Sequence, residues 1–426
     1  MPGTTAMSSW NRASRPVFSG GNRIQLLRGG DEFFPALLAE IERAQREVMI
    51  ETYIFNRDPS GLRIANALIA AASRGVRVHV TVDGFGSGGN IHALAQRFEG
   101  TGVIFDVYRR VRHWSDVFRR GSWRRLHRKL AQVDARVAFV GGVNIIDDRF
   151  DLHHGWSERP RLDFALRIEG PLVDAVTATM HVLRERLQWR REFIADLRGA
   201  GEGGAGDAVD RVREMVKRMR EHSPMQSRAA RENRSPIRAA FVVRDNVGQR
   251  RTIERAYVEA VVRARQRVTI VNPYFYPGRI FKRVLKRAAA RGVRVTLVMQ
   301  GKPDYRLAAW AAQALYDELL AAGIHIVEYA PAFLHAKVAV VDDGWATVGS
   351  SNIDPLSLLV NREANVIVLD TDFNAELTRE IDAAVAVSRP VTREKRRRGF
   401  AVWMIKRVVG TAARLFMAIT GARERF

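Results

Sequence analysis

The chain has 426 residues, enough for two domains of ordinary size, and its 46% hydrophobic content allows a substantial core. It has no cysteine, which excludes disulfides and thiolate metal sites, and 69 Lys and Arg against 46 Asp and Glu give a formal charge of +23. Such a charge favours anionic partners, either nucleic acid or an acidic lipid surface. The N-terminus shows no secretory signal, and no apolar run reaches the roughly 18 residues of a membrane-spanning helix.

The first part of the chain alternates predicted helices and strands. Residues 1–21 are rich in Ser, Gly, Arg and Pro and are expected to be disordered. Residues 32–46 have helical apolar spacing and lead into a buried strand that reads EVMIETYIF. The stretch 61–75 then predicts a helix that ends at Gly75, and residues 76–84 predict another strand. This order is typical of β-α-β units and therefore of a mostly parallel sheet.

The same order of segments occurs again in the second part. Residues 263–277, RARQRVTIVNPYFYP, match residues 43–55, RAQREVMIETYIF, and residues 287–301 match residues 70–84. The period, about 210 to 220 residues, is far longer than that of a solenoid repeat. We therefore predict two equivalent α/β halves.

The halves are expected at residues 22–195 and 237–390. Residues 196–236 are Gly-rich and then polar, which predicts a linker with a short helix at 208–221. Residues 391–426 contain the run REKRRR and an apolar segment interrupted by Lys and Arg. That pattern favours a helix lying in the interface of an acidic membrane, the alternative being an amphipathic helix packed on its own domain.

A second basic segment, residues 109–125, interleaves Arg with aromatic residues just before the motif described next. It suits a lipid headgroup interface. The alternatives are a loop anchored in its own core or a surface for single-stranded nucleic acid.

Each half contains one copy of the same motif. The copies are LHRKLAQVDARVAFVGGVN at 126–144 and LHAKVAVVDDGWATVGSSN at 334–352, and in both the His is followed by Lys at +2, Asp at +7, Gly at +14 and Asn at +17. On a strand the His and Lys side chains share a face, and the Asp falls in the next turn. Two copies in the same register are hard to assign to chance.

The two motifs predict phosphodiester chemistry if the halves pack about a pseudo-twofold axis. Two imidazoles, two ammonium groups and two carboxamides would then share one pocket, without an obvious metal cage. The cations and amides suit the non-bridging oxygens of a phosphodiester. One imidazole attacks phosphorus, while the other protonates the leaving alcohol and later deprotonates the acceptor.

A nucleophilic imidazole also needs its second ring nitrogen held by a carboxylate or a carbonyl group. Aligning the two halves places Asp163, in DFALRI, opposite Glu363, in EANVIV. We predict that this pair orients the two imidazoles. The sequence leaves open which carboxylate serves which His.

The duplicated H-x-K-x-x-x-x-D with its trailing G-x-x-N resembles the phospholipase D superfamily, over residues 22–389. More narrowly, NRIQLLRGGDEFFPALL, DGFGSGG, DFALRIEGP and NPYFYPG are similar to bacterial cardiolipin synthases of the B type. The resemblance implies an α/β fold of two tandem α-β-α sandwich halves packed about a pseudo-twofold axis. It also implies an active site between the halves, a phosphatidyl-histidine intermediate, and no metal or other cofactor.

The resemblance also assigns residue roles. The implied catalytic set, with His127 as nucleophile and His335 as general acid and base, is His127, Lys129, Asp134, His335, Lys337 and Asp342. The two Asp residues are interpreted as turn-formers more than as chemical groups. The implied phosphate-binding residues are Asn144, Asn352 and Ser350; a hydroxyl is expected on one side only, because the first copy has Gly142 in place of Ser350.

The implied activity is transfer of a phosphatidyl group between two phosphatidylglycerol molecules with release of glycerol. The implied location is the periphery of the cell membrane, on the cytoplasmic face of the inner membrane, with anionic phospholipid as partner and no obligatory nucleic acid. The motif alone indicates only phosphodiester chemistry, so a lipid hydrolase or nuclease of the same fold is the alternative. A third hypothesis is a membrane- or nucleic-acid-binding protein with an inactive catalytic site. Both motifs are intact, which argues against it. Oligomeric state is left open.

Four further residues are of types that occur in active sites. His153 and His154 lie in a polar stretch without ligand spacing and are expected to be structural. Glu51 and Asp83, at the ends of predicted strands, are interpreted equally well as pocket or as core residues.

Overall fold

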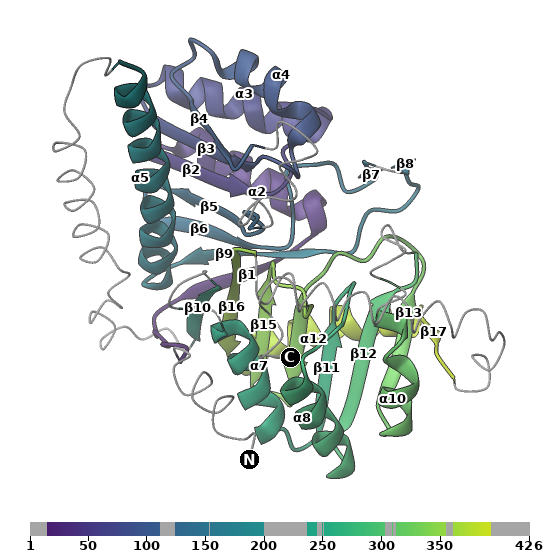
Figure 1. The fold of residues 1–426 in the computed structure, drawn as a ribbon. Coiled ribbons are helices and arrows are strands. Elements are labelled where there is room, and N and C mark those ends of the chain that lie inside the picture. The colour runs from purple at the N-terminus through teal and green to yellow at the C-terminus, as the bar shows by residue number, and fades with distance from the viewer. Residues whose placement is uncertain are drawn as a thin grey trace.

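The computed structural model describes residues 15–110, 124–152, 154–199, 237–244, 249, 251–302, 309, 312–354 and 361–392. Two large sheets of closely similar design dominate it (Figure 1). The first has the strand order β1-β9-β6-β5-β2-β3-β4. Its strands are β1 (Arg23–Arg28), β2 (Glu47–Thr52), β3 (Arg77–Asp83), β4 (Ile104–Tyr108), β5 (Lys129–Val133), β6 (Val137–Gly141) and β9 (Phe164–Glu169).

The second sheet repeats this order as β10-β16-β15-β14-β11-β12-β13 and adds β17 at its edge. Its strands are β10 (Arg238–Arg244), β11 (Arg267–Val271), β12 (Arg294–Gln300), β13 (His325–Tyr329), β14 (Val338–Val341), β15 (Trp345–Gly349), β16 (Glu363–Leu369) and β17 (Arg389–Pro390). The expectation of two equivalent halves is therefore confirmed. A small hairpin, β7 (Phe150–Asp151) and β8 (Gly155–Trp156), stands apart from both sheets.

The expectation of mostly parallel sheets is wrong. Only the pairs β2–β3 and β3–β4 are parallel in the first sheet, and β11–β12 and β12–β13 repeat this arrangement in the second. The other pairs of both sheets are antiparallel, among them the hairpins β5–β6 and β14–β15 that the two motifs form. The β-α-β rule thus applies to only part of each sheet.

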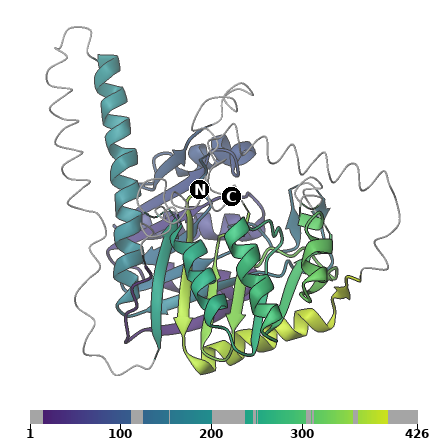
Figure 2. The same cartoon turned by 60° about the horizontal axis from the view of Figure 1, so that its bottom comes forward.

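Helices cover both sheets. They are α2 (Gly29–Arg43), α3 (Pro59–Ser73), the 3₁₀ turn η1 (Gly88–Asn90), α4 (Ile91–Phe98), α5 (Leu172–Gly199), α7 (Thr252–Arg263), α8 (Arg279–Ala290), α10 (Tyr316–Ala321) and α12 (Thr371–Ala386). Figure 2 shows the long α5 at the side of the first half and α12 lying along the second sheet.

The helix α3 illustrates why these segments are helical. The Asp58 side chain accepts a hydrogen bond from the Gly61 N–H (2.9 Å) and caps the helix, and Pro59 occupies its first turn. Ile64, Leu68 and Ala71, spaced by four and three residues, form its buried face.

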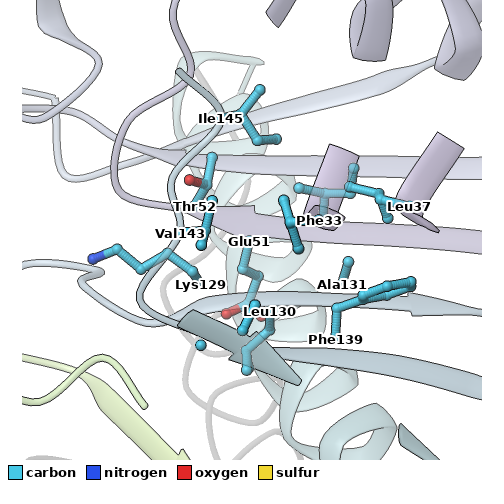
Figure 3. A pocket seen from close by; sticks show the side chains of 13 residues that line it. Phe33, Leu37, Glu51, Thr52, Lys129, Leu130, Ala131, Phe139, Val143 and Ile145 are labelled. Atoms are coloured by element: carbon cyan, nitrogen blue, oxygen red, sulfur yellow. The ribbon is translucent and has the colours of Figure 1, made fainter. Parts of the chain in front are cut away.

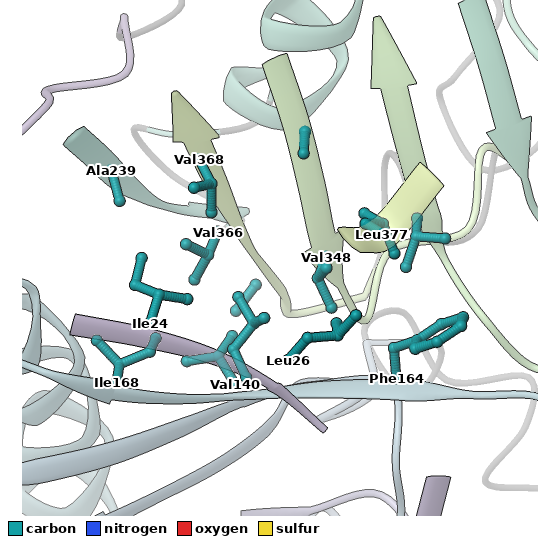
Figure 4. Packing of buried hydrophobic residues seen from close by; sticks show 14 of the residues in the cluster. Ile24, Leu26, Val140, Phe164, Ile168, Ala239, Val348, Val366, Val368 and Leu377 are labelled. Atoms are coloured by element: carbon teal, nitrogen blue, oxygen red, sulfur yellow. The ribbon is translucent and has the colours of Figure 1, made fainter. Parts of the chain in front are cut away.

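Three apolar layers result. One lies between the first sheet and the helices α2, α3 and α4, and another lies between the second sheet and α7, α8 and α10. The third lies between the two sheets and includes α5 and α12. Figure 4 shows Ile24, Val140 and Ile168 of the first sheet facing Val366 and Val368 of the second. Because this shared core joins the halves, it fixes the position of one motif relative to the other.

Two expected boundaries differ from the structure. Residues 15–21 are not a disordered tail: Ser19 forms an antiparallel bridge with Ala239. The buried side chain of Asn22 accepts a hydrogen bond from the Leu172 N–H (2.9 Å) at the start of α5, so this segment ties the halves together. The helix α5 also continues to Gly199, past the expected end of the first half at residue 195.

The linker helix expected at 208–221, most of the basic segment 109–125, and the C-terminal segment 393–426 lie outside the described residues. Within the described residues, no helix is both long enough and apolar enough to cross a bilayer.

Candidate active site

The two motifs meet where short parallel bridges join the halves. Leu126 pairs with Arg362, and Leu162 pairs with Leu334. The His127 N–H donates to the Arg362 carbonyl (3.1 Å), and the His335 N–H donates to the Leu162 carbonyl (2.9 Å). Each bridge therefore places the His of one half beside the acidic residue of the other half.

The side chains complete this crossed arrangement. His127 Nδ1 lies 2.9 Å from Glu363 Oε1 and 3.1 Å from Oε2, and His335 Nδ1 lies 2.6 Å from Asp163 Oδ2. The sequence had left this pairing open. An Nδ1–H that donates to a carboxylate leaves Nε2 as the basic atom of the ring. The two carboxylates are buried, whereas the imidazoles keep 13% and 24% of their side-chain surface exposed, so substrate can reach the rings.

The two motif lysines are buried beside the imidazoles. Lys129 Nζ donates to the His127 carbonyl (2.6 Å), and Lys337 Nζ donates to the His335 carbonyl. Burial lowers the pKa of Lys129 to about 7, and the nearby Lys337 contributes to this shift. An anion in the site would favour the charged ammonium form.

The stem of Lys129 borders a small apolar cavity inside the first half. Figure 3 shows the ammonium end pointing away from the apolar lining, which includes Phe33, Leu37 and Phe139. The core thus holds the methylene chain of Lys129, while its ammonium group lies outside the cavity. Glu51 also lines this cavity, and its Oε1 accepts a hydrogen bond from Arg128 Nη2 (2.9 Å), which makes Glu51 a paired core residue.

Burial and the neighbouring charges together set the protonation states of the four paired groups. Burial lowers the pKa of both imidazoles, that of His335 to about 3, against the opposing effect of the carboxylates. Burial alone would raise the pKa of Asp163 and of Glu363, but the adjacent His and Lys side chains outweigh it and lower both values. At neutral pH, before substrate binds, the site therefore holds neutral imidazoles and ionised carboxylates. A bound phosphodiester anion would raise the pKa of His335 and allow its protonation.

The two motif asparagines occupy equivalent places after β6 and β15, but their contacts differ. Asn144 is buried, and its Oδ1 accepts a hydrogen bond from the Ile54 N–H (3.2 Å). This bond leaves the amide N–H groups of Asn144 as donors. Asn352 Oδ1 is buried without a hydrogen-bond partner among the described residues.

Ser350, which the sequence predicted to bind phosphate, contacts Glu363 in the structure. Its hydroxyl donates to Glu363 Oε2 (2.6 Å) and accepts from the Ala364 N–H (3.0 Å), in a wholly buried position. The hydroxyl therefore holds the carboxylate that holds His127. The first copy has Gly142 here because a Cβ at this position would lie only 2.8 Å from Asp163 Cγ.

Asp134 and Asp342 do not belong to the reacting cluster, which corrects their place in the catalytic set. Asp134 accepts hydrogen bonds from the N–H groups of Gln45, Arg46 and Glu47 (2.8–2.9 Å), and Asp342 accepts from those of Arg265, Gln266 and Arg267 (2.8–3.3 Å). Both have positive φ angles, 55° and 48°. The physical reason is strand length: β5 separates Asp134 from His127 by roughly 17 Å of extended chain. The interpretation of both residues as turn-formers describes this geometry.

Two residues support the motif histidines through the backbone: Asp83, which the sequence left open as a pocket or core residue, and Gln300, which the sequence did not single out. Asp83 Oδ2 accepts a hydrogen bond from the Leu126 N–H (2.8 Å), and Gln300 Oε1 accepts one from the Leu334 N–H (2.8 Å). Each acceptor thus fixes the backbone just before a motif His. The available signal was their shared position at the end of equivalent strands, β3 and β12. His154 instead pairs with Asp151 (2.9 Å), outside this cluster.

No group of three or more His, Asp or Glu side chains that could hold a metal ion occurs in the part of the chain that the structure describes. The cluster combines two imidazole rings with two lysines. That donor set can stabilise the non-bridging oxygens of a phosphodiester through hydrogen bonds and charge.

Comparison with known proteins identifies the family to which the chain is similar. A protein-family model described as cardiolipin synthase, PLD-like domain, matches residues 37–155 and 257–385. Cardiolipin synthase B of Escherichia coli strain K12 is 37% identical over 369 residues, which cover 86% of this chain and 81% of that protein. Cardiolipin synthase B of Salmonella typhimurium strain LT2 is 39% identical over 360 residues, covering 84% and 79%.

Among solved structures, phosphatidylserine synthase of Haemophilus influenzae Rd KW20 superposes with a TM-score of 0.64. The match covers 99% of this chain and 98% of that chain at 13% sequence identity, so it shows the fold alone. The expected architecture of two tandem halves is confirmed.

Proposed function

Since this chain belongs to the cardiolipin synthase family of the phospholipase D superfamily, we propose that it transfers a phosphatidyl group from one phosphatidylglycerol to another. The products are cardiolipin and glycerol. The observation that carries the proposal is the crossed pairing of His127 with Glu363 and of His335 with Asp163. It leaves the Nε2 atoms of both imidazoles as the reactive groups of one site, with His127 neutral as the nucleophile and His335 protonated once the anionic substrate is bound.

In the first half-reaction, His127 Nε2 attacks the phosphorus of the donor lipid. The bond from phosphorus to the departing glycerol oxygen breaks, and protonated His335 gives its proton to that oxygen. A phosphatidyl-histidine remains. Glu363 stabilises the positive charge that develops on the His127 ring.

In the second half-reaction, the acceptor phosphatidylglycerol binds in place of glycerol. His335 removes the proton from its terminal hydroxyl, whose oxygen attacks phosphorus while the bond to His127 Nε2 breaks. Lys129, Lys337, Asn144 and Asn352 bind the non-bridging oxygens in both steps. Their positive charges and N–H donors stabilise the charge that accumulates in each transition state.

The lipid partner follows from the same proposal. Phosphatidylglycerol is anionic, and the chain carries a net charge of +23, with the run REKRRR near its C-terminus. Both properties support peripheral binding to an anionic bilayer through lipid headgroups. We place the enzyme on the cytoplasmic face of the inner membrane.

The test is incubation of the purified protein with phosphatidylglycerol vesicles in the absence of added metal, followed by lipid separation. Cardiolipin and glycerol in equal amounts support the proposal. Phosphatidic acid as the main product would show that water is the acceptor and that the protein is a hydrolase. Absence of any product from folded, vesicle-bound protein would favour a binding role.

A trapping experiment tests the nucleophile. The protein is incubated with labelled phosphatidylglycerol, and the reaction is then quenched. An acid-labile phosphatidyl adduct should be recovered from the wild-type protein and none from His127→Ala. An adduct on His335 in that variant would reverse the assignment of nucleophile and general acid.

A further inference from the structure

The His of the first motif has an aromatic neighbour. Tyr53 follows directly after β2, and its ring lies against the imidazole of His127, with centroids 4.9 Å apart and an interplanar angle of 60°. The ammonium nitrogen of Lys129 lies 5.4 Å from the centroid of the same ring. One side chain therefore contacts both the imidazole and the ammonium of the first motif.

The loop after β3 holds Tyr53 in this place. Ser87 Oγ donates to the Tyr53 carbonyl (3.0 Å) and accepts from the Phe55 N–H (3.0 Å), so it fixes the backbone on both sides of Ile54. A Cβ at Gly86 would clash first with the Tyr53 carbonyl oxygen and would lie 2.8 Å from Tyr53 Cγ, so any larger residue at position 86 would displace both the backbone and the ring of Tyr53. The ring position is thus built into the loop backbone.

The same loop also holds the residue before His127. Asp83, whose Oδ2 accepts from the Leu126 N–H, accepts through Oδ1 from the N–H groups of Phe85 (2.8 Å) and Gly86 (3.2 Å). Asp83 and Ser87 are both fully buried. The stretch DGFGS therefore links the position of the tyrosine ring to that of the imidazole.

The second half repeats only part of this arrangement. Gln300 replaces Asp83 as the acceptor for the residue before the motif His. In the repeat that matches residues 43–55 with 263–275, Pro273 stands in the place of Tyr53. The bridges Phe55–Ile145 and Phe275–Ile353 confirm that register in space. The tyrosine at this position is therefore not repeated in the second half, whereas the His, Lys and Asn of the motif are.

We propose that Tyr53 is a positioning residue for the first half-reaction, which keeps the His127 ring and the Lys129 ammonium aligned on the phosphorus. This role rests on the proposed transfer through His127. The contact with Tyr53 gives a physical reason why His127 and His335, each paired with a carboxylate, have different roles in the proposed reaction. The ring restricts rotation of the attacking imidazole, and its negative face favours the charged form of Lys129.

The experiment compares Tyr53→Leu, Tyr53→Phe and Gly86→Ala with Phe85→Leu as the matched control. Phe85 lies in the same loop but is 55% exposed, with its ring against Arg125. Rapid-quench kinetics with labelled phosphatidylglycerol as the substrate measure the rate of adduct formation. Tyr53→Leu and Gly86→Ala should slow it about ten- to a hundredfold, as expected for a misplaced reactive group, whereas Tyr53→Phe and the control stay near the wild-type rate.

Nuclear magnetic resonance of ¹⁵N-histidine-labelled protein gives a readout that does not depend on turnover. Tyr53→Leu should move the ring resonances of His127 and leave those of His335 in place. Unmoved His127 resonances, or adduct formation at the wild-type rate in Tyr53→Leu, would overturn the proposal. Equal losses in Tyr53→Phe and Tyr53→Leu would also overturn it, because the hydroxyl and not the ring would then be required.

The two readouts separate this proposal from the proposed function. A wild-type protein that forms no adduct would refute transfer through His127. The resonance comparison would still decide whether Tyr53 fixes the His127 ring, and thermal melting of each variant would exclude general loss of structure.

Discussion

The His127 imidazole and the Glu363 carboxylate are 236 residues apart in the chain, yet Nδ1 and Oε1 lie 2.9 Å apart. His335 and Asp163 mirror this contact from the opposite halves. Neither half alone therefore contains a complete pair. The shared apolar core between the two sheets is what keeps both pairs assembled.

The crossed pairs predict that the two carboxylates support different steps. Glu363→Gln should slow formation of the His127 adduct by on the order of 10³- to 10⁴-fold, the scale of losing a carboxylate that orients a catalytic imidazole. Asp163→Asn should impair proton transfer by His335 instead. A donor lipid with a p-nitrophenol leaving group needs no protonation, so it should restore adduct formation in Asp163→Asn only. Restoration in Glu363→Gln would contradict the crossed assignment.

Ser350→Ala should lower the rate of adduct formation about ten- to a hundredfold, the effect of losing a hydrogen bond to a charged group. The Ser350 hydroxyl contributes to the lowered pKa of Glu363, so its removal should raise that pKa. The acid side of the pH–rate profile should therefore move to higher pH. Ser351→Ala is the control, because the Ser351 hydroxyl bonds to the Asn352 carbonyl and not to Glu363. Equal effects of both substitutions would refute a specific role for Ser350.

Asp134→Ala should reduce stability and leave the chemistry of the folded protein nearly unchanged. Three backbone N–H groups lose their acceptor, each worth about 1–3 kcal/mol if it stays unsatisfied, so the melting temperature should fall by several degrees. Calorimetry measures this change, and kcat per folded molecule should stay within about threefold. The exposed Asp343 provides a control substitution. Loss of activity in Asp134→Ala with an unchanged melting temperature would contradict this prediction and would indicate a catalytic role for Asp134.

The buried Lys129 predicts an alkaline limit to activity. Its pKa in the empty site is about 7, and only its charged form stabilises a phosphodiester, so kcat/KM should fall as the pH rises above about 7. A bound anionic substrate raises this pKa, which moves the fall in kcat to higher pH. Lys129→Arg keeps its charge across this range and should remove the alkaline decline while lowering the maximum rate. A pH profile of kcat/KM that stays flat to pH 9 in the wild-type protein would contradict this prediction.

Removal of residues 393–426 should weaken binding to anionic vesicles. The segment contains REKRRR, and each basic residue near an acidic surface is worth about 1 kcal/mol. Co-sedimentation at low and high salt measures the loss, and circular dichroism checks that the fold is intact. Replacing only the basic residues of that run by Gln separates charge from the apolar segment that follows. Unchanged co-sedimentation of the truncated protein would refute the anchoring role.

Local patterns in the chain were sufficient to recognise the two halves and the groups that meet between them. A hairpin motif repeats its spacing of His, Lys, Asp, Gly and Asn because strand and turn geometry is set by near neighbours. The alignment of the two repeats likewise predicts that Asp163 and Glu363 occupy equivalent positions. The β-α-β pattern was a weaker guide, because antiparallel pairing of β1 with β9 and of β10 with β16 has no signature in neighbouring residues.

The crossed pairing depends on how one half packs on the other. His127 meets Glu363 only because two sheets from different parts of the chain bury their apolar faces against each other. The hydrogen bond from Ser350 to Glu363 and the contact of Tyr53 with His127 likewise join segments that are distant in sequence. Spacing along a chain specifies which side chains share a strand face, but packing free energy, summed over the whole interface, selects their partners.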